Sequence, residues 1–203
     1  MLAMTNTATP SLRHPSTALL VIDVQASFPA RPYWRAEGAP TFLAATNQLI
    51  AGFEAAGLPI VRVLHEDGPA RTDNPFSTLS GLVRPLDGLR EFTPALTVLK
   101  HRHSALVGTE LGIWLHQQGI RRLVVTGIRT EQCCETTTRH ASDEGWTVDY
   151  VPDATLTFDM TTPTGERLSA AQIVERTVTV LAGRFATICT PEQALQRATE
   201  AAA

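Results

Sequence analysis

Residues 123–141 read LVVTGIRTEQCCETTTRHA, and this stretch decides the fold. Its first three residues form a short β-branched apolar run that is typical of a buried parallel strand. Gly127 is expected to end that strand, and Thr130 is the expected N-cap of a helix that continues to about Asp143. The stretch therefore predicts a strand, a tight turn and a helix, which is the basic unit of an α/β fold.

Cys133 would lie in the first turn of this helix, directly after the strand. Unpaired N–H groups and the helix dipole stabilise an anion at that place, so we expect a thiol shifted toward thiolate that can act as a nucleophile. The alternative is that Cys133 and Cys134 are small buried apolar residues, as most free cysteines are. The stretch alone favours this second interpretation.

Length and composition indicate one domain. The chain has 203 residues, of which 43% are hydrophobic and 18% are charged, enough for one well-buried core and too few for two independent ones. We expect a flexible N-terminal leader at residues 1–15, followed by a single domain at residues 16–203.

Charge and cysteine content exclude several classes of partner. The formal net charge is −3, so neither nucleic acid nor a membrane is an expected partner, and no apolar run approaches the length of a membrane span. Three cysteines, two of them adjacent, do not form a disulfide framework. These features favour a cytoplasmic protein.

Strand and helix patterns alternate along the rest of the chain. This alternation predicts an α/β fold: a single three-layer, doubly wound domain with a mainly parallel sheet of about six strands and helices on both faces. We expect strands at 17–24, 60–64, 96–99, 123–125, 148–151 and 185–188, a loop at 152–168, and helices at 41–56, 110–118, 130–143 and 169–181 and from 191 onward.

Three reactive side chains stand at carboxyl ends of the predicted strands: Asp23, Lys100 and Cys133. In open parallel sheets the ligand crevice lies at that edge, so these groups are expected to converge. A thiolate can attack an acyl carbon while the carboxylate moves protons and the lysine stabilises the charges. Lys100 could instead be a surface lysine, but its place between an apolar run and a helix favours the functional role.

Three ordered segments resemble the isochorismatase-like cysteine hydrolase family, and the resemblance extends over about residues 16–190. The segments are LLVIDVQASF at 19–28, Lys100 with SALVGTEL at 104–111, and VTGIRTEQC at 125–133. The resemblance implies a doubly wound sheet with strand order 3-2-1-4-5-6 and a catalytic triad at Asp23, Lys100 and Cys133.

The same resemblance implies further features of the site. A cis peptide bond is expected between Ile128 and Arg129, and the backbone N–H groups of Arg129 and Cys133 are expected to form the oxyanion hole. Homodimers or homotetramers are also implied. The long loop at residues 65–94 and the helix of Trp114 offer apolar surface for such an assembly.

The cysteine at position 133 distinguishes between two reactions known in the family. Isochorismatases that cleave a vinyl ether typically lack a cysteine at the position of Cys133, so its presence favours C–N hydrolysis through a thioester. Nicotinamidases carry an Asp, His, His metal set, whereas no second histidine follows His65 nearby, so neither a metal nor another cofactor is expected.

Aromatic and basic residues suggest how a small-molecule substrate is held. Arg129 could reach a substrate carboxylate or pair with Glu131. His65 could line the pocket or lie on the surface, with equal weight. The candidate pocket residues are Phe28, Tyr33, Trp34, His65, Ile128 and Arg129.

The sequence thus favours a cysteine amidohydrolase acting on a small amide, imide or carbamoyl compound. Cys134 is expected to be a packing residue, and Cys189 is expected to belong to a core strand. One alternative is a vinyl-ether hydrolase that does not need the thiol, and another is a non-catalytic binding protein on the same fold. A redox role for the adjacent cysteines is weaker, because the Cys-x-x-Cys spacing of redox pairs is missing from the sequence.

Overall fold

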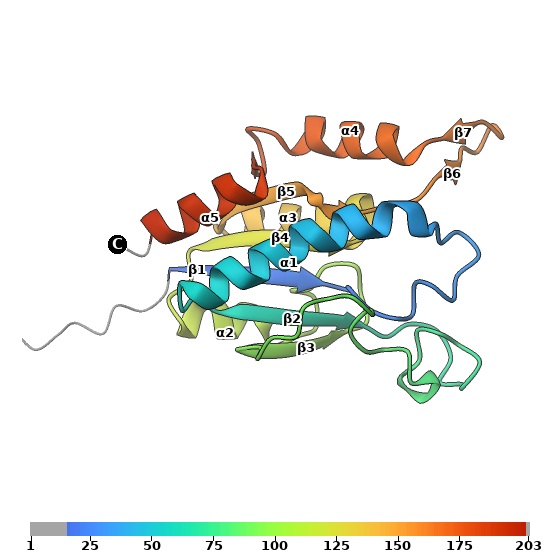
Figure 1. Cartoon of the computed structure of the whole chain (residues 1–203), viewed down its shortest axis with the longest axis horizontal. Coiled ribbons are helices and arrows are strands. Elements are labelled where there is room, and N and C mark those ends of the chain that lie inside the picture. Colours follow the sequence, from blue (N-terminus) through green and yellow to red (C-terminus); the bar gives the residue numbers. More distant parts are fainter. Residues whose placement is uncertain (1–15, 202–203) are drawn as a thin grey trace, which may run out of the picture.

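Six parallel strands form the middle layer of the molecule (Figure 1). The computed structural model describes residues 16–201, so the predicted leader at 1–15 lies outside the described residues. The strand order is β3-β2-β1-β4-β5-β8. The strands are β1 Thr17–Ile22, β2 Ile60–His65, β3 Leu96–Lys100, β4 Arg122–Ile128, β5 Thr147–Leu156 and β8 Thr187–Ile188.

This order confirms the predicted order 3-2-1-4-5-6, with β8 as the sixth strand of the sheet. Two short strands that the sequence did not predict, β6 Met160–Thr161 and β7 Arg167–Leu168, pair with each other as a separate antiparallel hairpin. They occupy part of the segment predicted to be a loop. The three-layer, doubly wound α/β architecture is therefore confirmed.

Helices cover both faces of the sheet. In Figure 1, α1 and α5 lie in front of it and α2 and α3 lie behind it. Helix α4 contacts α3 and the turn that precedes α3. The helices are α1 Ala39–Ala55, α2 Leu111–Gln117, α3 Glu135–Asp143, α4 Ala170–Leu181 and α5 Pro191–Glu200. Among the helices of residues 16–201, none combines the length and the hydrophobicity that crossing a bilayer requires.

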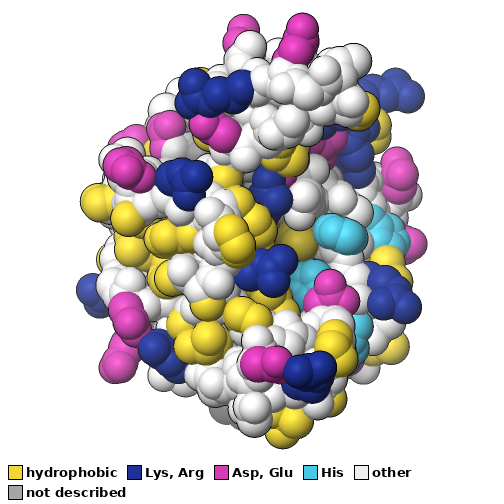
Figure 2. Space-filling view, turned by 90° about the vertical axis from the view of Figure 1, so that its right-hand side faces the viewer, with side chains coloured by type: hydrophobic (Ala, Val, Ile, Leu, Met, Phe, Trp, Pro, Cys, Tyr) yellow, Lys and Arg dark blue, Asp and Glu magenta, His cyan; other side chains and the backbone are white. Residues whose placement is uncertain are grey.

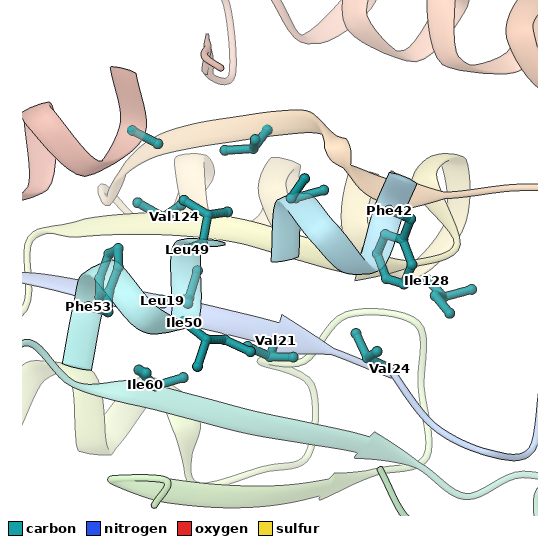
Figure 3. Packing of buried hydrophobic residues seen from close by; sticks show 14 of the residues in the cluster. Leu19, Val21, Val24, Phe42, Leu49, Ile50, Phe53, Ile60, Val124 and Ile128 are labelled. Atoms are coloured by element: carbon teal, nitrogen blue, oxygen red, sulfur yellow. The ribbon is translucent and has the colours of Figure 1, made fainter. Parts of the chain in front are cut away.

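The core between α1 and the sheet follows from two periodicities. Leu49, Ile50 and Phe53 share one face of α1, and Figure 3 shows them facing Leu19 and Val124 of the sheet. All five side chains are fully buried. Burial of each side chain contributes about 2 kcal/mol to the free energy of unfolding, so this interface fixes the middle of the sheet and with it the strand ends.

Gly127 does not end β4, because the strand continues to Ile128. Its φ is +139°, and a Cβ atom at this position would overlap the carbonyl oxygen of Ile22 and lie 2.7 Å from the carbonyl carbon. The glycine therefore permits a close approach between β4 and the end of β1. The prediction that Gly127 stops the strand was wrong, since the residue serves packing between strands and not termination.

Strand β5 is longer than predicted because it contains a bulge. Its pairing with β4 passes from Val125 opposite Tyr150 to Gly127 opposite Thr155, so β5 advances five residues while β4 advances two. The bulge accommodates Pro152, whose missing N–H would interrupt a regular ladder. The predicted end of the strand before Pro152 was therefore wrong.

Two predictions near the C-terminus need smaller corrections. The last strand is Thr187–Ile188, because Phe185 donates its backbone N–H to the carbonyl of Leu181 in a turn and does not join the sheet. Cys189 directly follows this strand and is buried in the core cluster under α1. The prediction that Cys189 belongs to a strand was therefore wrong, although the residue does lie in the core.

Replacement of Asp149 by alanine is expected to lower the free energy of unfolding by about 2 kcal/mol. The fully buried Asp149 carboxylate of β5 lies 2.9 Å from Arg122 Nη1 and 3.1 Å from Arg197 Nε, so it joins β4 to α5. Urea unfolding monitored by circular dichroism measures the effect.

The matched control for this change is Asp87→Ala, which removes a carboxylate from an exposed pair with Arg84. Exposed pairs contribute little, so the control is expected to leave the free energy of unfolding nearly unchanged. Equal effects of the two variants would contradict the assigned role of Asp149.

Candidate active site

A cavity of about 280 Å³ opens at the carboxyl ends of the strands. Figure 2 views the molecule toward this edge, and Lys or Arg, His and hydrophobic side chains surround a hollow at its centre. The long loop between β2 and β3 supplies several walls of the cavity, which is a common role for a loop of this length. The cavity is lined by Phe28, Arg31, Tyr33, His65, Asp67, Gly68, Asn74, Phe76, His103, Arg129, Gln132 and Cys133.

Two of the candidate pocket residues lie away from this cavity. Ile128 is fully buried and belongs to the core under α1. The ring of Trp34 packs against Phe158 with 5.4 Å between ring centroids. The aromatic wall is formed instead by Phe28, Tyr33 and Phe76.

Asp23, Lys100 and Cys133 come together at the cavity. Lys100 Nζ lies 2.8 Å from Asp23 Oδ2 and 3.3 Å from Cys133 Sγ. Asp23 follows β1 with a φ of +54°, and Lys100 is the last residue of β3. Cys133 lines the cavity, whereas Asp23 and Lys100 are fully buried behind it. Parallel strands thus bring three distant residues into one cluster.

The turn that contains Cys133 differs from the predicted helix start. Thr130–Cys134 form one π-helical turn and α3 begins only at Glu135, with Arg129 and not Thr130 at the N-cap position of the π turn. The Thr130 hydroxyl donates instead to Thr155 Oγ1 at 2.9 Å. Cys133 therefore lies in a π turn and not in the first turn of an α-helix. The peptide bond between Ile128 and Arg129, which precedes this turn, is cis.

Burial and charge act against the thiolate in the resting site. Burial raises the pKa of Cys133 well above its usual range, and the Asp23 carboxylate raises it further, while Lys100 lowers it only in part. The prediction of a thiol shifted toward thiolate by the helix dipole was wrong, because desolvation and the nearby carboxylate dominate. The raised pKa favours the thiol form of Cys133 in the resting site.

Lys100 keeps its proton. Burial alone would lower the pKa of this ammonium, but the charges and hydrogen bonds of Asp23 and Cys133 more than offset burial, so the pKa is raised above its ordinary value. The group is therefore a permanent cation and acts only as a hydrogen-bond donor.

His65 lies among these groups, a placement that sequence reasoning left open. Its Nδ1 is 2.8 Å from Lys100 Nζ, 3.5 Å from Asp23 Oδ2 and 3.8 Å from Cys133 Sγ. Gln25 holds the backbone of His65, accepting from its N–H at 2.8 Å and donating to its carbonyl at 2.9 Å. Sequence reasoning missed Gln25, although its position two residues after Asp23 at a strand end could have indicated a role in the site.

Known proteins resemble this chain in sequence and in structure. The profile of the isochorismatase domain matches residues 17–192, which is most of the chain. This protein belongs to the isochorismatase family. An isochorismatase-family protein from Chromobacterium violaceum has a similar solved structure, with a TM-score of 0.79 and 27% identity over 97% of this chain and 100% of that one.

Two curated proteins are also similar to this chain in sequence. Streptothricin hydrolase from Streptomyces noursei is 33% identical over 79% of this chain and 62% of its own length. Nicotinamidase 3 from Arabidopsis thaliana is 39% identical over 32% of this chain and 33% of its own length. The chain therefore spans under two thirds of both relatives.

The isochorismatase-family site contains one group of atoms with the spacing of a metal site. Ligand atoms of Asp23, His65 and Cys133 lie within 4.8 Å of one another. Lys100 Nζ, however, contacts both Asp23 Oδ2 and His65 Nδ1 at 2.8 Å. A metal cation bound there would be repelled by the ammonium, so these residues do not fit a metal ion.

Arg129 forms a buried ion pair with Glu131 at the cavity wall. Its Nη2 lies 3.0 Å from Glu131 Oε1, and Glu131 Oε2 accepts from the Thr157 hydroxyl. The guanidinium carbon is 5.1 Å from the centroid of the Tyr33 ring. Pairing with Glu131 thus fixes the guanidinium while Arg129 still lines the cavity.

The alkylation rate of Cys133 is expected to rise with pH by about tenfold per unit up to about pH 10, with no plateau. The raised pKa keeps the thiolate fraction small and increasing throughout this range. Iodoacetamide labelling followed by peptide mass mapping measures the rate, with N-acetylcysteine as the control thiol. A plateau below the pKa of the free thiol would contradict this prediction.

Proposed function

We propose that this isochorismatase-family protein hydrolyses the C–N bond of a small amide, imide or carbamoyl compound through a thioester on Cys133. One observation carries the proposal: a carboxylate, an ammonium and a thiol cluster at one small cavity, with Lys100 Nζ in contact with both Asp23 and Cys133. This arrangement combines a base, a charge stabiliser and a nucleophile at a place that a substrate can enter.

The reaction begins from the neutral thiol. Asp23 accepts the proton of Cys133 as Sγ attacks the carbonyl carbon, and the new charge on sulfur is avoided because attack and proton transfer are coupled. Asp23 then passes the proton to the leaving nitrogen, and the C–N bond breaks to release ammonia or an amine. Lys100 stabilises the carboxylate and the sulfur during both transfers.

The second half of the reaction regenerates the enzyme. Asp23, again ionised, accepts a proton from water as the water oxygen attacks the thioester carbon. The C–S bond then breaks as Asp23 gives this proton to Cys133 Sγ, which releases the carboxylic acid and restores the thiol and the carboxylate. We assign the backbone N–H groups of Arg129 and Cys133 to the oxyanion of both tetrahedral intermediates. Removal of one such donor in other enzymes costs about 10²-fold or more in kcat.

The relatives support the class of bond. Nicotinamidase is named for hydrolysis of an amide, and streptothricin hydrolase is likewise a hydrolase by name. The thiol at Cys133 supports an amidase over a vinyl-ether hydrolase, because vinyl-ether cleavage by acid chemistry has no use for a nucleophile.

The test is release of ammonia from a panel of small amides, imides and carbamoyl compounds, together with intact-mass analysis of acid-quenched enzyme. We expect turnover of at least one compound and an acyl adduct on Cys133, which fragment-ion mass spectrometry distinguishes from an adduct on the adjacent Cys134. Turnover of isochorismate without turnover of any amide would overturn the proposal in favour of the vinyl-ether reaction. An adduct on Cys134 in place of Cys133 would overturn the assigned nucleophile.

A further inference from the structure

The Lys100 ammonium has more acceptors around it than it has protons. Its three N–H groups face four neighbours. These are Asp23 Oδ2 at 2.8 Å, His65 Nδ1 at 2.8 Å, the carbonyl oxygen of Arg102 at 3.1 Å and Cys133 Sγ at 3.3 Å. The neighbours therefore compete, and Cys133 holds the longest of the four contacts.

This competition sets the tautomer of His65. Lys100 is a permanent cation with no acceptor, so Nδ1 of His65 must accept and the ring proton must lie on Nε2. Nε2 is buried and has no hydrogen-bond partner among residues 16–201. The imidazole therefore acts on the site through Nδ1, as an acceptor.

His65 is itself held firmly. It ends β2 directly opposite Lys100 in the ladder between β2 and β3, and Gln25 bonds both its N–H and its carbonyl. The Phe76 ring packs against the imidazole edge to face, with 5.9 Å between centroids. Only 8% of the residue is exposed. A fixed backbone and a packed ring keep Nδ1 aimed at Nζ.

We propose that His65 is a positioning residue of this site, which takes one N–H of Lys100 and so holds the ammonium on Asp23 while competing with Cys133 for the N–H groups. This inference rests on the proposed function and adds a fourth member to the set of Asp23, Lys100 and Cys133. In this arrangement the thiol stays protonated at rest, and Lys100 remains in place to stabilise charge during the reaction.

The other titratable groups around Cys133 do not replace His65. Glu131 and Cys134 belong to the same turn, and Tyr150 approaches from β5 with its hydroxyl donated to the carbonyl of Thr130. Glu131 is paired with Arg129. Among residues 16–201, His65 is therefore the one side chain that offers a nitrogen acceptor to Lys100.

The test compares three substitutions at His65. Leucine has about the size of histidine but no acceptor. Asparagine places its side-chain oxygen near the position of Nδ1, whereas the longer glutamine places it near that of Nε2. Two quantities are measured: kcat and KM on an amide that the wild type hydrolyses, and the rate of Cys133 alkylation at about pH 8.

We expect His65→Leu to lower kcat by about 10²-fold with KM changed by less than about threefold, because the reacting groups lose their alignment. Alkylation of Cys133 should become about three- to tenfold faster, since the freed N–H turns to sulfur and increases the thiolate fraction. His65→Asn should restore both values toward the wild type, and His65→Gln should resemble His65→Leu.

The asparagine variant also shows whether faster alkylation of Cys133 comes from a more reactive thiol or from easier entry of the reagent. Asparagine is smaller than histidine, so faster alkylation caused by a wider entrance would be greater in His65→Asn than in His65→Leu. His116→Leu is the matched control, because His116 lies exposed on α2 with Nδ1 bonded to the Gly112 carbonyl. This control should change neither quantity.

Two results would overturn the proposal. One is an unchanged rate of Cys133 alkylation in His65→Leu, and the other is a His65→Asn variant whose kcat and alkylation rate equal those of His65→Leu. If His65→Leu fails to fold, as thermal unfolding would show, the contrast between asparagine and glutamine decides in the same way. Alkylation needs no substrate. The expected alkylation pattern without turnover of any amide by the wild type would therefore support His65 and refute the proposed function.

Discussion

Replacement of Cys133 by alanine is expected to lower kcat/KM for amide hydrolysis by about 10⁴-fold or more, because the covalent route is lost. Lys100 and Asp23 remain in contact in this variant, so the fold and the buried ion pair should persist. Ammonia release measures the loss, and circular dichroism checks that the variant is folded.

The matched control is Cys134→Ala. Cys134 is the neighbouring residue and is fully buried, but it does not line the cavity. Burial is the main cause that raises the pKa of Cys134 well above its usual range, and the nearby Asp23 carboxylate raises it further, so the thiol is unreactive. This variant should keep most of the activity. Full turnover of an amide by Cys133→Ala would refute the thioester mechanism, and isochorismate turnover that survives it would favour the vinyl-ether alternative.

Gly127→Ala is expected to lower the free energy of unfolding by about 3 kcal/mol or more. A Cβ atom there would overlap the carbonyl oxygen of Ile22, so β4 and β1 would have to separate. Asp23 follows Ile22 directly, and the displaced strand end would also move the carboxylate away from Cys133. Urea unfolding and ammonia release measure the two effects.

Gly57→Ala is the matched control, because it introduces backbone strain without a steric clash. Gly57 follows α1 with a φ of +66°, but a Cβ atom there would meet nothing within 4 Å. Its substitution should cost only about 1 kcal/mol, the usual penalty of a left-handed backbone for alanine, and should leave turnover unchanged. Similar losses in the two variants would show that the approach to Ile22 is not the cause.

The class of fold could be predicted from local pattern because parallel strands covered on both faces are continuous apolar runs. The runs before Asp23 and around Val124 became β1 and β4, side by side in the sheet. Pro152 and Gly127 misled the prediction, since both residues usually mark the end of a strand. Here one lies in a bulge and the other at a close contact between strands, and neither arrangement is visible without the partner strand.

The sequence by itself determined that Asp23, Lys100 and Cys133 stand at carboxyl ends of strands, because topology brings those ends to one edge whatever the details of packing. The raised pKa of Cys133 and the contact between His65 and Lys100 follow from the folded structure alone. A pKa depends on burial and on charges a few ångströms away. The hydrogen bond between Lys100 and His65 depends on the distance between residues on different strands. Neither quantity is encoded in local sequence, so both appear only when the chain is folded.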